Sequence, residues 1–225
     1  MKKYTKFFGF AFTLVLVCQI GIAKDPEVLI DSQKTRVFMS DEYTFYGIDF
    51  SKFRLINTTK MHLGENIKND FFPAWLREFD DKYTKKDLRP RLVVDVLNDE
   101  RSRFQVEQFL KNDPSNIVSY FSTLWNADTL LSMVQDYQLD RETGIGISFI
   151  IAEFNKNEEE VIGYVTFFDI ETRELMFVVK ALGDAVGMGM TSHWYNGLYD
   201  AWNDYFYQNF SMDKKKAIRT AKREG

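Results

Sequence analysis

The chain has 225 residues, a hydrophobic content of 45% and a formal net charge of −4 at pH 7. A chain of this length suits a single domain, and its apolar content is too high for a disordered protein. One cysteine and two histidines exclude a disulfide framework, a cysteine-ligated metal and a multi-histidine zinc site.

The segment 1–23 has the pattern of a cleavable secretory signal. Three lysines precede an apolar run at 7–17, and small residues at 21–23 allow cleavage near Ala23. Cleavage would remove Cys18 and three of the 29 basic residues, so the net charge would fall from −4 to −7. We therefore expect an acidic, cysteine-free protein that is exported to the periplasm or secreted.

Two alternatives to cleavage follow from the same segment. A membrane anchor needs ~20 apolar residues, but this run is shorter and Gln19 interrupts it. A bacterial lipoprotein would keep Cys18 as its acylated N-terminus, but a small residue is expected before such a cysteine and Val17 stands there. The expected organisation is a signal at 1–23, a domain at 24–212 and a basic tail at 213–225.

The first half of the domain alternates between strand and helix patterns. Residues 35–56 are rich in β-formers and predict one long strand or two short ones. Aromatic residues at three- and four-residue spacing predict a helix at 70–83, with Asp70 as its cap. The nearly continuous apolar run at 91–97 predicts a buried central strand.

Three helices are expected in the middle of the chain. One spans 101–111, and a second follows Asp113-Pro114, where aspartate fits an N-cap and apolar residues recur to Trp125. The third spans 128–137, because its apolar residues form one stripe.

The clearest pattern is three β-rich runs at 147–154, 161–169 and 175–182, joined by short polar segments. Connections this short force an antiparallel meander, because a parallel crossover needs a dozen or more residues. Ser192 then fits an N-cap for an aromatic helix at 193–209. We therefore expect an α/β fold: a mixed sheet of about five strands with helices on at least one face.

The segment 143–205 resembles small exported proteins of unknown function from bacteroidete bacteria. In these proteins a V-x-F-F-D-I-x-T-x-E-like strand pair, a Gly-rich turn and a Trp-rich helix follow in the same order. The segments YGIDFSKFRLI and FFPAWLREF resemble the N-terminal half of the group. The resemblance implies no catalytic residues.

A more distant similarity concerns the turn Asp169-x-x-Thr172-x-Glu174. It is similar to the D-x-x-T-G-E turn of a periplasmic α/β domain found in the curli-secretion lipoprotein, the penicillin-binding-protein activator lipoprotein and the Tol-system β-propeller protein. Arg173 replaces the usual glycine. The similarity implies a docking or assembly module, although a shared fold does not fix function.

Several residues are candidates for a catalytic or anion site. The glycines at 183, 187 and 189 follow a strand and precede a helix, but no Lys-Ser/Thr pair completes a phosphate loop, so a simple turn is favoured. Carboxylates at strand positions offer acid/base candidates only if they converge; otherwise Asp169 shapes a turn, Asp95 caps or pairs at a strand end, and Asp49 and Glu153 face solvent. These candidates are Asp49, Asp95, Glu153 and Asp169, with His193 as a possible proton shuttle.

Some aromatic residues of the last helix are candidates for ligand contact. Tyr195, Tyr207 and Phe210 fall outside its buried stripe and are the first candidates for contact with a ligand or partner. The second histidine, His62, lies in an expected loop without a visible partner.

The tail at 213–225 is strongly basic against an acidic body. Such a tail can contact an anionic membrane, or can simply extend the last helix into solvent. Its basic residues are Lys214, Lys215, Lys216, Arg219, Lys222 and Arg223.

The sequence favours a non-catalytic envelope module that binds a protein partner or a cell-wall component. A hydrolase that uses carboxylates without a metal is the alternative, and peripheral membrane association through the tail is a third possibility. Neither a cofactor, a metal nor nucleic acid is expected, and the sequence sets no oligomeric state.

Overall fold

The structure is a computed structural model that describes residues 27–58, 64–122 and 125–224. The expected signal and His62 lie outside these residues. The strands are β1 (Glu27–Ile30), β2 (Glu42–Asp49), β3 (Arg54–Ile56), β4 (Val96–Asp99), β5 (Val118–Ser119), β6 (Ile145–Asn155), β7 (Glu160–Asp169) and β8 (Leu175–Asp184).

Helices precede, separate and follow these strands. The α-helices are α1 (Lys34–Met39), α2 (Gly64–Asn66), α3 (Phe72–Lys82), α4 (Lys85–Leu92), α5 (Arg101–Lys111), α6 (Ala127–Gln135), α7 (Met190–Asn203) and α8 (Ser211–Glu224). Two π-helical segments, η1 (Ile67–Phe71) and η3 (Asp204–Phe210), and one 3₁₀ turn, η2 (Pro114–Asn116), complete the described helices.

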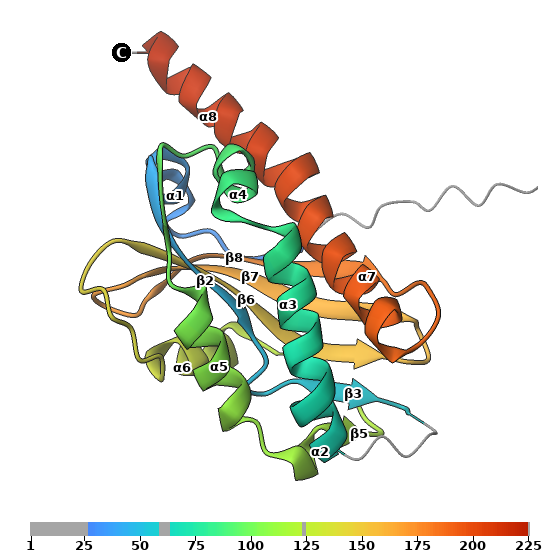
Figure 1. The fold of residues 1–225 in the computed structure, drawn as a ribbon. Helices are drawn as coiled ribbons and strands as arrows, with labels where there is room; N and C mark the ends of the chain where they lie inside the picture. The colour runs from blue at the N-terminus through green and yellow to red at the C-terminus, as the bar shows by residue number, and fades with distance from the viewer. Residues whose placement is uncertain (1–26, 59–63, 123–124, 225) are drawn as a thin grey trace, which may run out of the picture.

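The described strands form one mixed, eight-stranded sheet, so the expected α/β class is confirmed with more strands than expected (Figure 1). The order is β1-β8-β7-β6-β2-β4, and β3 pairs with both β5 and β6. Strands β6, β7 and β8 form the predicted antiparallel meander. Strand β2 runs parallel to β6 on one side and to β4 on the other.

The two faces of the sheet carry different side chains. One face, called the apolar face here, packs against α3, α4, α7 and η3 in a large cluster of aromatic and aliphatic residues. Trp202 lies in this cluster, with its ring 5.3 Å from those of Phe45 and Phe149. Glycine allows α7 to approach closely, because a Cβ on Gly183 would lie 2.1 Å from the carbonyl oxygen of Gly197.

The opposite face, called the polar face here, has a smaller apolar cluster and several buried polar groups. Helix α6 covers it with Leu130, Met133 and Val134, and Phe104 of α5 joins the same cluster. The aliphatic stripe of α6 agrees with the helix predicted at 128–137. Buried polar side chains here include Asp49, Ser148 and Thr166.

The buried central strand predicted at 91–97 is wrong. Arg91 and Leu92 end α4, and strand pairing begins only at Val96, in an edge strand. A capping box between Thr84 and Asp87 starts this helix, and its apolar residues are buried at i and i+4 spacing. Val93 ends α4 in the left-handed region with φ 54°, so the apolar run divides between two elements.

The helix predicted after Asp113-Pro114 is also wrong beyond its first turn. Asp113 caps that turn by accepting a hydrogen bond from the backbone N–H of Ser115. Pairing with β3 then replaces the helix, because Leu55 N–H donates to the carbonyl of Ile117 at 2.7 Å. Phe121, which the helical pattern places on a packed stripe, is exposed.

Other boundaries differ in smaller ways. Residues 35–56 give two strands as allowed, but α1 occupies the start of this region. The helix that contains Asp70 begins before this residue, so Asp70 is not its cap. Gly189, not Ser192, is the N-cap of the aromatic helix, which begins at Met190. The helix predicted at 101–111 is confirmed.

The basic tail continues the aromatic helix. Residues from Met190 to Glu224 are helical throughout, by way of η3, so the expected boundary at 212/213 falls inside α8. Helix α8 packs on α1 at its base and then projects from the body (Figure 1). None of the helices in the described ranges is both long and apolar enough to span a lipid bilayer.

Candidate binding cleft

A cleft opens on the polar face where β2 gives way to β3. Both strands pair with β6, but residues 50–53 between them leave the ladder. The end of α5, the turn η2 and helix α6 close around this gap and leave a cleft of about 590 Å³. Concave sites with convergent polar groups are the usual places for ligands in proteins.

Helix α5 reaches the cleft because it packs beside the second half of β2. Gln105 accepts a hydrogen bond from the N–H of Ile48 at 2.9 Å and donates to Asp80 at 3.0 Å. Arg101 forms an ion pair with Asp99 at 2.7 Å, which fixes the start of the helix. Gly47 is required here, because a Cβ would lie 2.4 Å from the Gln105 oxygen.

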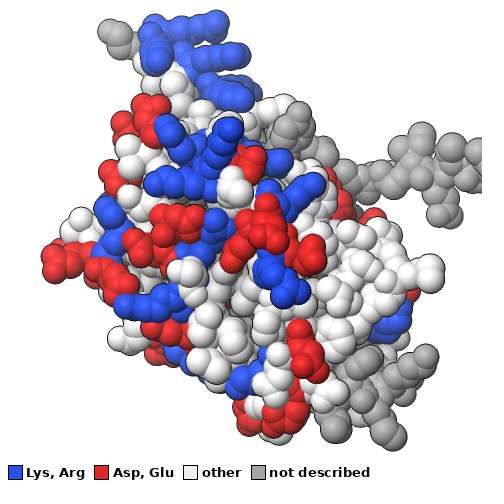
Figure 2. Space-filling view, viewed as in Figure 1, with Lys and Arg blue, Asp and Glu red and all other residues white. Residues whose placement is uncertain are grey.

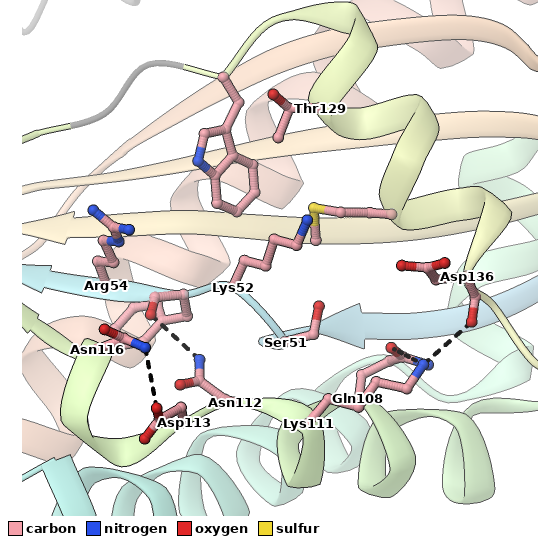
Figure 3. A pocket seen from close by; sticks show the side chains of 13 residues that line it. Ser51, Lys52, Arg54, Gln108, Lys111, Asn112, Asp113, Asn116, Thr129 and Asp136 are labelled. Atoms are coloured by element: carbon pink, nitrogen blue, oxygen red, sulfur yellow. Dashed lines mark hydrogen bonds between the residues drawn. The ribbon is translucent and has the colours of Figure 1, made fainter.

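The lining of the cleft is mainly polar, with both signs of charge and two aromatic residues, Phe53 and Trp125 (Figure 3). The 13 residues are Ser51, Lys52, Phe53, Arg54, Gln108, Lys111, Asn112, Asp113, Asn116, Trp125, Thr129, Met133 and Asp136.

Several polar residues in the lining are fixed by hydrogen bonds (Figure 3). Lys111 Nζ donates to the carbonyl of Asp136 at 3.3 Å and to Gln108 Oε1 at 3.2 Å. Asn112 is buried and its amide donates to the carbonyl of Phe50 at 2.6 Å. These bonds join α5 to α6 and to residues 50–53, so the walls of the cleft are held together by its own lining.

Two donors in the lining lack partners. The Nε2 group of Gln108 is buried without a hydrogen bond, in a side chain that is only 1% exposed. Lys52 is exposed, and the described residues provide no ion pair for it. A buried donor without a partner costs roughly 1–3 kcal/mol, so its presence calls for an explanation.

Trp125 supplies the aromatic wall. Its ring stacks on that of Tyr164 at 5.9 Å with an interplanar angle of 15°. The chain has four tryptophans, and the other three are buried in the apolar face. Trp125 is therefore the tryptophan that a ligand in the cleft can reach.

A row of buried polar groups lies in the same face of the sheet. Asp49 accepts hydrogen bonds from the N–H of Ser51 at 2.7 Å and from the hydroxyl of Tyr137 at 2.8 Å. The Tyr137 hydroxyl also lies 3.3 Å from that of Ser148, which is 2.7 Å from the hydroxyl of Thr166. Burial raises the pKa of Asp49, although both hydrogen bonds oppose this shift. The row holds the end of β2 against β6 and β7.

The carboxylates proposed from the sequence do not form one site. Asp49 and Glu153 are buried, which overturns the interpretation that they face solvent, and neither lines the cleft. Glu153 accepts a hydrogen bond from Ser122 at 2.7 Å. Asp95 is exposed, before the start of β4 and thus at the opposite end of β2 from Asp49.

Asp169 shapes a turn, in agreement with one of the two interpretations of this residue from the sequence. Its carboxylate accepts hydrogen bonds from the N–H groups of Glu171 and Thr172, at 3.0 and 3.1 Å. Arg173 follows with φ 60°, the left-handed conformation that glycine adopts most easily. This turn therefore places a non-glycine residue in the left-handed region.

The other predicted contacts lie away from the cleft. Phe210 is 1% exposed and packs in the apolar face, so the expectation that it is exposed is wrong. Tyr195 is half-buried against the same cluster, and the side chain of Tyr207 lies outside the described set. His193 is half-buried beside Trp194, and its buried Nε2 has no hydrogen-bond partner.

The Gly-rich segment does not follow a parallel strand, as the glycines of a nucleotide-binding loop do. Gly183 belongs to antiparallel β8, whereas Gly187 and Gly189 adopt φ values of 118° and 82° in the turn before α7. In the tail, Lys214 is buried, which corrects its assignment as a membrane contact. The other basic residues of α8 are exposed.

Sequence patterns do not reveal the cleft, because its lining comes from separate segments of the chain. The helical pattern assigns Trp125 to a helix that does not form. Lys52 and Gln108 do not belong to any sequence motif. The sequence feature that could have indicated the cleft is the irregular segment at 50–53 after β2, because it interrupts a run of β-formers.

Comparison with protein-family models, curated proteins and solved structures gives no match for this chain. The described residues also contain no group of three or more histidine, cysteine or acidic side chains placed to hold a metal ion. The geometry of the cleft is therefore the main guide to function.

Proposed function

We propose that this protein is a non-catalytic binding module of the bacterial envelope, and that its cleft binds a glycan of the cell wall. The observation that carries the proposal is the lining, which combines an accessible tryptophan ring with side-chain amides and an unpaired lysine. The signal-like pattern at 1–23 supports export.

The chemistry of a cell-wall glycan matches each part of this lining. Its sugar rings have an apolar face that can lie on Trp125, since aromatic rings provide large contact surfaces with defined geometry. Its acetamido groups accept hydrogen bonds of the kind that Gln108 and Asn116 donate. Its carboxylates suit the ammonium of Lys52.

The geometry supports binding better than hydrolysis. A glycosidase needs two carboxyl groups that face the scissile bond, one of which must carry a proton. The cleft lining contains two carboxyl groups, Asp113 and Asp136, and the hydrogen bond from Ser115 N–H lowers the pKa of Asp113, whereas a proton donor needs a raised pKa. Asp49 has a raised pKa but is fully buried below the lining and bonded at both oxygens.

Cosedimentation with purified insoluble peptidoglycan tests this proposal. The wild-type protein should sediment with the polymer, and Trp125→Ala should bind roughly ten-fold or more weakly, because one stacked ring contributes on the order of 1–3 kcal/mol. Lys52→Gln should show a smaller loss that disappears in high salt.

Lys156→Gln is the matched control, because it removes the same charge from the exposed β6–β7 turn. It should bind like the wild type. Equal binding by wild type and Trp125→Ala, with both proteins folded, would show that the cleft is not the binding site.

A further inference from the structure

A second surface lies at the end of the molecule where α4 and α8 meet the apolar face. It is called the basic end here, and it consists of exposed basic residues on these two helices. They are Lys85, Lys86 and Arg89 of α4, and Lys215, Lys216, Arg219, Lys222 and Arg223 of α8.

The basic residues of α8 gather on one side of the helix. At the ideal rotation of about 100° per residue, the five exposed ones fall within an arc of about 120°. Asp213 falls outside this arc. Lys214 points the opposite way, into the body, where Nζ donates to the carbonyl of Ser40 at 2.6 Å. Its burial fixes the rotation of α8, so that the basic arc faces outward.

Helix α4 presents its basic residues on the same face of the molecule. Figure 2 shows blue side chains over both α4 and α8. Arg91 joins α4 to α7 by a hydrogen bond to Asn203, and its guanidinium lies 5.3 Å from the ring of Tyr83 at the end of α3. The two helices therefore present one surface of fixed shape.

The exposed cations of the basic end differ from several other cations of the chain in their ion pairing. Within the described ranges, the basic side chains of this surface form no ion pair, whereas several exposed cations elsewhere do, such as Arg103 with Asp140 at 2.6 Å and Lys156 with Glu159 at 2.9 Å. The chain as a whole is acidic, with 33 acidic residues against 29 basic ones. Such a separation of charge orients a protein on a negative surface.

From this arrangement we infer that the basic end docks the protein on an anionic phospholipid bilayer. Helix α8 projects from the body, so its basic arc can approach a flat surface before the acidic body does (Figure 1). Basic residues close to an anionic membrane add attraction independently of one another, and salt weakens it. This surface is distinct from the cleft, so a docked protein leaves the cleft open.

Vesicle cosedimentation tests the inference. The chain lacking the segment 1–23 should sediment at low salt with vesicles that contain phosphatidylglycerol as the minor component in phosphatidylcholine, and remain in solution with phosphatidylcholine alone. The triple variant Lys215→Gln/Arg219→Gln/Lys222→Gln should lower the partition coefficient by on the order of 100-fold. Its thermal midpoint should not change, because the three side chains are exposed.

The matched control is Arg103→Gln/Arg141→Gln/Lys156→Gln, which removes the same net charge from other surfaces and should lower partitioning by less than ten-fold. The inference is overturned if wild type fails to sediment with the anionic vesicles at low salt, or if the two triple variants lose binding equally. Retention on a soluble polyanion such as heparin without vesicle binding would also overturn it, in favour of a different partner.

Discussion

The two faces of the sheet bury different kinds of side chains. On the apolar face, three tryptophans and many phenylalanines are buried without access to solvent. On the polar face, a row of hydrogen-bonded groups lies beside a cleft whose lining includes an unpartnered amide N–H donor and a fourth tryptophan. The cleft therefore lies on the polar face, which is the face where we propose that a ligand binds.

The largest effect is expected on the apolar face. Trp202→Ala should lower the free energy of unfolding by about 3–5 kcal/mol, because it leaves a cavity among Phe45, Phe79 and Phe149. Trp202→Phe should cost much less, since the buried Nε1 of Trp202 has no hydrogen-bond partner to lose. Urea denaturation measures both, and similar losses for the two variants would contradict this account of the packing.

The next effect concerns the buried cation next to the apolar face. Burial lowers the pKa of Lys214 from 10.5 to about 7, against the opposing attraction of Asp41 and Asp95, while Tyr43 and Ser40 face its ammonium. Below pH 7 Lys214 is protonated in both the folded and the unfolded chain, so the full cost of burying its charge lowers the stability of the fold. Between pH 7 and 10.5 the unfolded chain binds more protons, so wild-type stability should rise with pH, by on the order of a few kcal/mol.

Lys214→Met removes this dependence. The stability of the wild type relative to the variant, from denaturation at pH 6 and pH 9.5, should therefore increase with pH. A difference that stays constant would mean that the ammonium is not desolvated in the folded protein.

A smaller effect is expected in the polar row. Tyr137→Phe removes one of two hydrogen bonds to buried Asp49 and should cost about 1–3 kcal/mol at pH 7. The pKa of Asp49 is already raised by burial, and loss of the donor raises it further. A protonated Asp49 gains less from the Tyr137 hydrogen bond than an ionised one, so the loss of stability should be smaller near pH 4. A loss that is independent of pH would argue that Asp49 is not ionised in the folded protein.

The smallest effect on stability should accompany a loss of binding. Gln108→Leu removes the unpartnered Nε2 donor together with one hydrogen bond from Lys111, so the free energy of unfolding should change by less than about 1 kcal/mol, while glycan affinity should fall roughly ten-fold. Gln105→Leu is the matched control one turn earlier in α5. Both ends of Gln105 are bonded, so its variant should lose about 1–3 kcal/mol of stability and keep its affinity. If Gln108→Leu instead lost stability and kept its affinity, while Gln105→Leu lost affinity, Gln108 would have a structural role and not a role in binding.

The sequence predicted the regions where one local pattern dominates. The meander and α5 follow from strand alternation, short connections and helical spacing, so they could be read in order along the chain. At 91–97 and after Pro114, local patterns failed because distant partners decided the structure: Leu92 packs in the apolar cluster, and residues 118–119 pair with β3.

The cleft was beyond prediction for a related reason. Its lining brings Lys52, Gln108 and Trp125 together from segments that are far apart in sequence, and the gap between β2 and β3 exists only because both strands pair with β6. Burial of Asp49 and Lys214 likewise depends on elements that close over them. Residue type alone predicted both to be exposed.

Fluorine NMR of the protein labelled with 5-fluorotryptophan tests the central claim most directly. The four tryptophans give four resonances, which Trp→Phe variants assign, and Trp125 is the one that lines the cleft. Titration with a soluble disaccharide-peptide fragment of peptidoglycan should shift the resonance of Trp125 with saturation and leave those of Trp75, Trp194 and Trp202 unchanged. No shift at millimolar ligand, or a shift confined to the buried tryptophans, would contradict the assignment of the cleft as a glycan-binding site.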